Sequence, residues 1–162
     1  MFDLGTSLIA SVARDPDALA IVDGDVRLSY REWLGQISAL VVAFDQLGLK
    51  PGDHILTALQ NRWEAATLHW ACQLAGLVVT PINWRAKPDE IEFYLSDSQA
   101  RAIVYQDVSA EAVAGSPRAR GLCRIVVGMS AGDEAGAEIK HGACVPPEVP
   151  APVPRRLRAR RG

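Results

Sequence analysis

HILTALQNRWEAATLHWACQLAGLVVTPI, residues 54–82, predicts a strand, a helix and a second strand. The first and last six residues are short apolar runs next to turn residues, as in strands that are buried on both faces. Between them, apolar residues repeat at helical spacing, and Ala65, Leu68 and Cys72 make the opposite side of the helix apolar as well. A strand–helix–strand unit of about 30 residues joins parallel strands. The sequence therefore predicts an α/β fold with a mainly parallel sheet and a helix buried between layers.

The segments on either side extend this α/β pattern. Short apolar runs bounded by Gly, Pro and Asp predict strands, and stretches with an apolar residue every three or four positions predict helices. The expected elements are a helix at residues 4–12, a β-hairpin at 18–28, a helix at 30–47, a helix at 88–97, a strand at 102–105, a helical turn at 109–114 and a strand at 124–127.

Two pairs of residues have the spacing of a helix capping box. Ser29 and Glu32 stand at the start of the helix expected at residues 30–47, and Asn61 and Glu64 stand at the start of the helix in the 54–82 stretch. In a capping box, the first side chain accepts from the amide three residues on, and the acidic side chain reaches back to the first amide. We therefore expect both helices to begin at these pairs.

Charge and composition change sharply near the end of the chain. The final eight residues hold five of the 17 basic residues and no acidic one, so residues 1–154 carry a net charge of −7. A body this acidic argues against nucleic-acid binding through phosphate contacts. Residues 128–154 are rich in Gly, Ala and Pro and have no sustained periodicity. We expect a partial α/β domain at residues 1–127 and a low-order, disordered tail at residues 128–162.

Cellular location is indicated by three sequence features. No apolar run approaches the roughly 18 residues that span a bilayer, and the first residues lack the pattern of a signal peptide. The three cysteines, Cys72, Cys123 and Cys144, are odd in number and more than 20 residues apart, which suits neither a disulfide framework nor a C-x-x-C metal site. We therefore expect a cytoplasmic protein that binds no metal through these residues.

Four segments together resemble the N-terminal part of the AMP-forming acyl-CoA synthetase and adenylation superfamily. Residues 28–33, LSYREW, resemble the family's L-[ST]-Y-x-E-L element, and residues 47–53, LGLKPGD, resemble its L-G-[VI]-x-x-G-D turn. Residues 59–61, LQN, resemble its L-x-N element, and residues 74–83, LAGLVVTPIN, resemble its A-G-x-x-x-x-P-x-[ND] element. Each match is weak alone, but their shared order and spacing across residues 5–127 make them specific together. The residues from Asn83 to Glu90 favour the fatty-acid or aromatic-acid CoA ligases within that superfamily.

The resemblance implies a two-step reaction in complete family members. ATP and a carboxylic acid form an acyl-adenylate with the help of Mg²⁺, and the thiol of CoA then displaces AMP. The family's phosphate loop, which ends in Pro-Lys-Gly, does not occur in these 162 residues, nor does the region of its catalytic lysine. We therefore expect a truncated or frameshifted ligase that is inactive alone and binds none of these cofactors, and we assign no catalytic residue. Whether the chain is an enzyme by itself stays open.

The alternative is an interaction module that completes a partner carrying the missing motifs. A sheet that later sequence would normally extend leaves edges exposed, so self-association through these edges is also open.

Arg85 is the candidate for ligand contact, and the resemblance implies a phosphate of CoA as the ligand. A guanidinium suits a phosphate, although an ordinary solvated loop arginine would have the same sequence signature. Lys87 has the same two interpretations. His69 and Cys72, three positions apart on a helix, have no further partners at metal-ligand spacing, so we interpret Cys72 as a packing residue.

Overall fold

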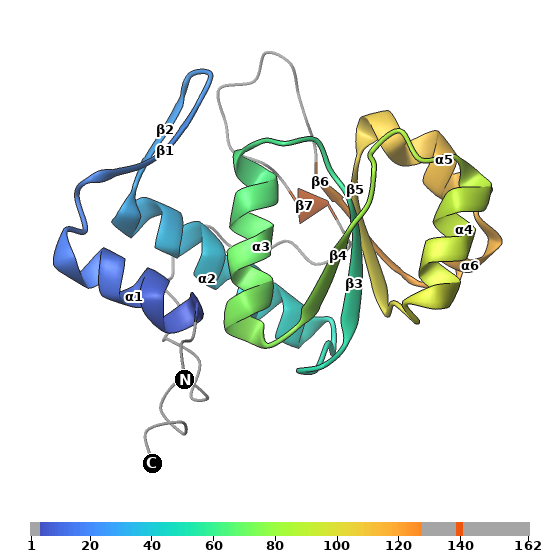
Figure 1. Ribbon diagram of the computed structural model, residues 1–162, viewed down its shortest axis with the longest axis horizontal. Coiled ribbons are helices and arrows are strands. Elements are labelled where there is room, and N and C mark those ends of the chain that lie inside the picture. The colour runs from blue at the N-terminus through green and yellow to red at the C-terminus, as the bar shows by residue number, and fades with distance from the viewer. Residues whose placement is uncertain (1–3, 128–138, 141–162) are drawn as a thin grey trace.

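The computed structural model describes residues 4–127, together with the backbone of residues 139–140. It is a mixed α/β fold in which one sheet lies between two groups of helices (Figure 1). The N-terminal elements are α1 (Leu4–Arg14), β1 (Leu19–Asp23), β2 (Val26–Ser29), α2 (Tyr30–Gln46), β3 (His54–Ala58), α3 (Trp63–Ala75) and β4 (Val78–Pro81). They are followed by α4 (Pro88–Asp97), β5 (Ala102–Gln106), the 3-10 turn η1 (Asp107–Ser109), α5 (Ala110–Gly115), α6 (Pro117–Arg120), β6 (Cys123–Val127) and β7 (Ile139–Lys140).

The main sheet has the strand order β4-β3-β5-β6-β7. Its first four strands are parallel, and β7 pairs with β6 in the antiparallel direction. β1 and β2 form a separate antiparallel hairpin. This topology confirms the α/β class and the mainly parallel sheet expected from the strand–helix–strand stretch.

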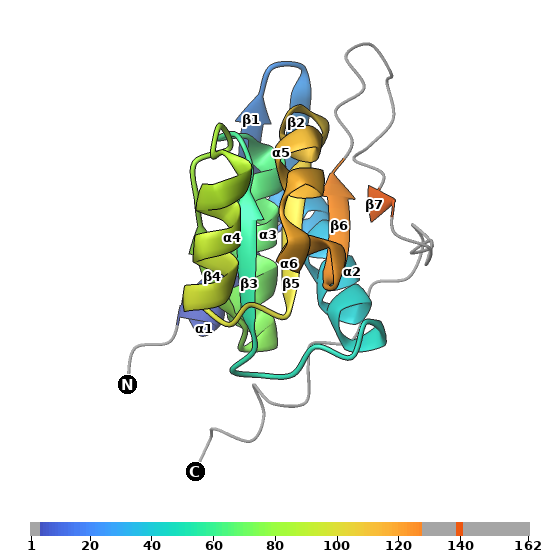
Figure 2. The same ribbon diagram turned by 90° about the vertical axis from the view of Figure 1, so that its right-hand side faces the viewer.

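The two faces of the sheet are covered by different helices. One hydrophobic cluster joins α1, α2 and α3 to the sheet and contains the buried side chains of Phe44, Leu68 and Val104. A second cluster lies under α4, α5 and α6 and contains Ile91, Leu95 and Ile103. In Figure 2, α4, α5 and α6 lie in front of the strands, and α2 and α3 lie behind them. The opposite sides of β5 thus belong to separate cores, which explains why residues 102–105 of this strand are all apolar.

The capping box at the start of α2 is confirmed. The amide of Glu32 donates to Oγ of Ser29 at 3.3 Å, and Oε2 of Glu32 accepts from the amide of Ser29 at 2.8 Å. The bond from the Ser29 amide, followed by the bond from its hydroxyl, lowers the pKa of Glu32. A local sequence pattern was sufficient here because both partners lie within one turn.

The second expected capping box is wrong. α3 begins after Arg62, whose side chain makes no capping bond, and the amide of Trp63 instead donates to Oδ2 of Asp23 at 3.0 Å. Asp23 lies at the end of β1, 40 positions earlier in the chain. The first amide of the helix therefore bonds to a carboxylate that the hairpin brings to it, and the Asn61–Glu64 pattern is not used.

Most other element boundaries agree with the sequence expectations within one or two residues, and the helix at 88–97 agrees at both ends. α6 was not expected. The expected tail lies outside the described residues, apart from β7, whose backbone pairs with Val126 and Val127. In the described part of the chain, no helix has both the length and the apolar character needed to cross a membrane.

Candidate functional site

The carboxyl ends of the four parallel strands lie along one edge of the sheet. The connection that leaves β3 contains α3, and the connection that leaves β5 contains α5 and α6, which cover the opposite face (Figure 1). The direction in which successive strands are added to the sheet therefore reverses between β3 and β5. In open α/β sheets, the crevice outside such a pair of strands is where ligands bind.

A buried glutamine occupies this position between β3 and β5. Gln106 ends β5 with only 1% of its surface exposed, and its Oε1 accepts from the amide of Gln60 at 2.8 Å. This bond ties the loop after β3 to the end of β5. Sequence reasoning missed Gln106, and the signal available was a single amide residue at the end of an otherwise apolar strand.

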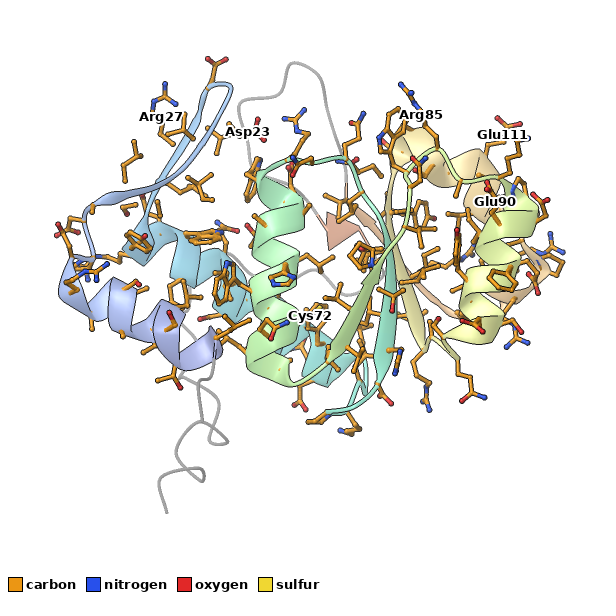
Figure 3. All side chains as sticks on the ribbon, in the orientation of Figure 1. Asp23, Arg27, Cys72, Arg85, Glu90 and Glu111 are labelled. Carbon is orange, nitrogen blue, oxygen red and sulfur yellow. The ribbon has the colours of Figure 1, made fainter. Side chains whose placement is uncertain are left out.

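Arg85 lies in the loop that follows β4, on the same edge of the sheet. Its amide donates to Oδ1 of Asn83 at 3.0 Å, and its Cζ lies 4.3 Å from the centroid of the Trp84 ring. The carbonyl of Trp84 accepts from Oγ of Ser109 at 2.7 Å, which anchors the loop to the segment after β5. Figure 3 shows Arg85 at the margin of the molecule, pointing away from the core. The guanidinium is thus exposed but supported by an aromatic face.

Lys87 shares this loop with Arg85. Its amide donates to Oε2 of Glu90 at 2.7 Å, at the point where α4 begins. Lys87 is exposed, as is Arg85. The structure therefore places both sequence candidates at the carboxyl edge.

Three charged residues meet where the hairpin contacts the start of α3. Nε of Arg62 lies 3.6 Å from Oδ2 of Asp23 and 3.7 Å from Oε2 of Glu64. Figure 3 shows Asp23 beside the first turn of α3. The one guanidinium is shared by two carboxylates, so this group of three carries a net charge of −1.

The thiols of Cys72 and Cys123 are free and unsuited to nucleophilic chemistry. Cys72 is fully buried in the α1–α3 core, and burial raises the pKa of its thiol to about 12. Burial also raises the pKa of Cys123. Since the thiolate is the reactive form, neither group is poised to react. Cys72 thus has the packing role expected from the sequence, and no group of three His, Cys, Asp or Glu side chains in the described residues could hold a metal ion.

Comparison with known proteins gives a consistent result. The family model described as "AMP-binding enzyme" matches residues 8–157. A 2-hydroxy-7-methoxy-5-methyl-1-naphthoate–CoA ligase from Streptomyces carzinostaticus is 31% identical over 108 residues, which are 67% of this chain and 19% of that ligase. A feruloyl-CoA synthase from an Amycolatopsis species is 28% identical over 140 residues, which are 86% of this chain and 28% of that synthase.

The solved structures show the same fold. The benzoate CoA ligase of Burkholderia xenovorans LB400 matches with a TM-score of 0.71 at 18% identity, covering 80% of this chain and 26% of that one. This chain therefore spans less than a third of each of these three proteins. Because the family model covers most of the chain, and because the three-layer fold agrees, the chain belongs to the AMP-binding enzyme family.

Proposed function

We propose that these residues supply the N-terminal part of the substrate-binding domain of a ligase that joins a fatty or aromatic carboxylic acid to CoA. The observation that carries this proposal is the family match over residues 8–157, and the ligases among the relatives support it. Such an enzyme would use ATP and Mg²⁺ to form an acyl-adenylate and would then transfer the acyl group to CoA.

The 162 residues do not complete this chemistry by themselves. Charge develops on phosphate oxygens during adenylation, and it needs cationic or amide donors that are already in place. A Ser/Thr/Gly-rich loop ending in Pro-Lys-Gly is absent from this sequence, and the described residues offer no cluster for a metal. We therefore propose that activity requires a further stretch of polypeptide, and no residue described here is assigned to Mg²⁺.

The test is ATP–pyrophosphate exchange that depends on added acid. The purified chain is assayed alone, with benzoate and fatty acids, and then mixed with a polypeptide that carries the remaining ligase motifs. We expect no exchange from the chain alone, whereas acid-dependent exchange from the mixture would favour the interaction module that is considered below as a second candidate. Robust exchange by the chain alone would contradict the proposal that a further polypeptide is required.

Arg85 is proposed to contact a phosphate of CoA. Its guanidinium is exposed at the carboxyl edge and rests on the Trp84 ring, which limits its freedom before a ligand arrives. In the mixture with the polypeptide that carries the remaining ligase motifs, Arg85→Ala should weaken CoA binding by roughly three- to tenfold, because an exposed charged hydrogen bond is worth about 1 kcal/mol. Arg101→Ala is the matched control, since Arg101 is exposed at the opposite end of β5. Calorimetry measures the CoA affinity of both variants. Equal losses of affinity would show that Arg85 does not contact CoA.

A second candidate function is an interaction module that completes a partner carrying the missing motifs. Val78 on β4, at one edge of the sheet, is 42% exposed, and among the described strands β4 pairs with β3 alone. Such an edge can pair with another chain, and pairing of two copies at this edge would give self-association. Size-exclusion chromatography of this chain, co-expressed with the products of the neighbouring genes, tests the interaction module. A stoichiometric complex supports the module, and a lone monomer contradicts it.

We place the chain in the cytoplasm because the thiols of Cys72 and Cys123 are free.

A further inference from the structure

The outer side of α4 exposes two aromatic side chains. Phe93 is 62% exposed, the highest value among the large hydrophobic side chains of the described residues, and Tyr94 is 37% exposed. Their rings meet edge to face, with centroids 5.6 Å apart. Ile91 and Leu95 of the same helix are completely buried against the sheet. α4 therefore has an apolar side that the core covers and an aromatic pair that no described residue covers.

α4 is also the most negatively charged of the described helices. It has four acidic residues and no basic one, a net charge of −4, whereas no other described helix is more negative than −1. Glu92 is paired with Arg118. The carboxylates of Asp89, Glu90 and Asp97 form no ion pair with a described residue. Three of the four negative charges on this helix are therefore not neutralised within the described part of the chain.

These three carboxylates lie next to Phe93 on the surface of the helix. Asp89 and Glu90 precede Phe93 by four and three positions, and Asp97 follows it by four. Residues with these spacings are neighbours on a helix surface, and all four are exposed. We name Asp89, Glu90, Phe93, Tyr94 and Asp97 the α4 face. It suits a guanidinium, because the planar cation stacks on an aromatic ring while its N–H groups donate to carboxylates.

The same chain contains a segment of complementary charge. Residues 155–161, RRLRARR, hold five arginines and no acidic residue, and they lie outside the described residues. Their guanidinium groups have the chemistry that the α4 face suits, and the opposite charges attract each other. A nucleic acid or an anionic lipid surface would instead be repelled by the three carboxylates. Charge complementarity therefore favours this segment as the occupant of the α4 face.

The connection to this segment is long enough to reach α4. Arg155 follows Lys140, whose backbone pairs in β7, by 15 positions. An extended chain of that length spans about 50 Å, whereas a folded body of the size of residues 4–127 is about 35 Å across. A tether of this kind holds its end at an effective concentration on the order of 1 mM. Several ion pairs that are weak individually are then sufficient, and contact within one chain is favoured over contact between copies.

We propose that residues 155–161 bind the α4 face of the same chain, with one arginine stacked on the Phe93 ring and others paired with the carboxylates of Asp89, Glu90 and Asp97. The bound segment covers the exposed aromatic pair. The contact uses neither Arg85 nor Gln106, so the inference does not rest on the proposed ligase function. Its test therefore does not require an active ligase.

NMR spectra of the whole chain test this contact. We expect nuclear Overhauser effects between the ring protons of Phe93 and arginine side-chain protons. The amide signals of residues 89–97 should shift when the five arginines of residues 155–161 are replaced by serine. Raising the salt concentration from about 50 mM to about 500 mM should move the α4 signals of the parent chain toward those of the serine variant, because salt screens ion pairs at a surface.

Two outcomes of these spectra would overturn the proposal. Identical α4 signals in the parent chain and the serine variant would show that the segment does not contact α4. Shifts that grow with protein concentration would show contact between copies and not within one chain. The Overhauser effects and the salt dependence are measured on the parent chain, so the test holds even if a variant fails to fold.

Variants of the α4 face separate stacking from general charge attraction. In each variant, the α4 signals are compared between chains with the five arginines and chains with the five serines. Phe93→Leu keeps an apolar side chain but removes the aromatic ring, and should reduce the shift difference by about twofold. Asp97→Asn removes one of the three unpaired carboxylates and should reduce it by about a third.

The matched control for Asp97→Asn is Asp25→Asn. Asp25 is an exposed acid in the turn between β1 and β2, and this hairpin and α4 lie toward opposite ends of the molecule (Figure 1). Asp25→Asn removes the same charge and should leave the shift difference unchanged. Equal effects of Asp25→Asn and Asp97→Asn would show attraction to the acidic body as a whole, and would overturn the assignment to the α4 face.

Discussion

The helices pack differently on the two faces of the central sheet. On one face, α4, α5 and α6 have only 10, 6 and 4 residues, yet four of their side chains are completely buried: Ile91, Leu95, Val113 and Ala119. On the other face, α1, α2 and α3 have 11, 17 and 13 residues, yet a cavity remains between α2, α3 and strands β5 and β6. Figure 1 shows the two helix layers on either side of the strands. Close packing of α4, α5 and α6 thus depends on the contacts between these helices and not on their length.

Specific contacts hold the short helices in place. Oε2 of Glu92 on α4 accepts from Oγ of Ser116 at 2.6 Å and from the amide of Arg118 at 2.9 Å, which joins α4 to the start of α6. At the end of α5, a Cβ added to Gly115 would lie 2.8 Å from Pro88. α5 and α4 therefore approach more closely than any other residue at position 115 would allow.

The largest expected effect compares one buried leucine from each face. Leu95→Ala on α4 should cost about 3–4 kcal/mol, because the side chain has no exposed surface and its removal opens a new cavity. Leu40→Ala should cost less, about 2 kcal/mol, because Leu40 already faces unfilled space and has fewer contacts to lose. Urea unfolding of both variants measures the difference. Equal losses would mean that the cavity next to Leu40 is filled in solution.

A smaller effect, of opposite sign on the two faces, is expected from replacing glycine by alanine. Gly115→Ala should destabilise by about 1–3 kcal/mol, because the new methyl group would overlap Pro88. Gly35→Ala on α2 should stabilise by about 0.5–1 kcal/mol, since the added Cβ meets nothing within 4 Å and alanine is the better helix former. Thermal melts of the pair check both signs, and stabilisation by Gly115→Ala would contradict the close approach of α5 to α4.

The smallest expected effect concerns pH and the α4–α6 face. The bond from Ser116, and then the bond from the Arg118 amide, lower the pKa of Glu92 below its ordinary value of 4.5. A lowered folded-state pKa contributes stability above the ordinary value, and this contribution is lost as the pH falls through the folded value. Glu92→Gln should therefore flatten the decline in melting temperature between about pH 5 and pH 3. A decline as steep as that of the parent chain would show that these bonds do not form in solution.

The sequence predicted the structural features that depend on residues close together in the chain. The Ser29–Glu32 capping box lies within one helical turn, and the strands around residues 54–82 follow from local apolar runs and turn residues. The position of Arg85 at the carboxyl edge also follows from its place after a strand. These features depend on short-range periodicity and capping, which a single sequence displays directly.

The sequence did not predict features that depend on distant partners. The acceptor for the first amide of α3 is Asp23, on the hairpin, so the Asn61–Glu64 pattern pointed to the wrong residues. Gln106 acquires its role from Gln60, 46 positions away. Such contacts follow from tertiary packing, which one sequence without relatives does not specify.

The central claim is that a cavity lies beside α2 and α3 on one face of the sheet, whereas the described residues of α4, α5 and α6 pack closely on the other face. The same substitution on each face tests this claim most directly. Ala43 on α2 lines the cavity, and Ala119 on α6 is completely buried. Ala43→Leu should raise the free energy of unfolding by about 0.5–1 kcal/mol by filling space, and Ala119→Leu should lower it by about 1–3 kcal/mol by overpacking. Opposite signs in urea unfolding are the predicted result. Destabilisation of similar size in both variants would contradict the claim.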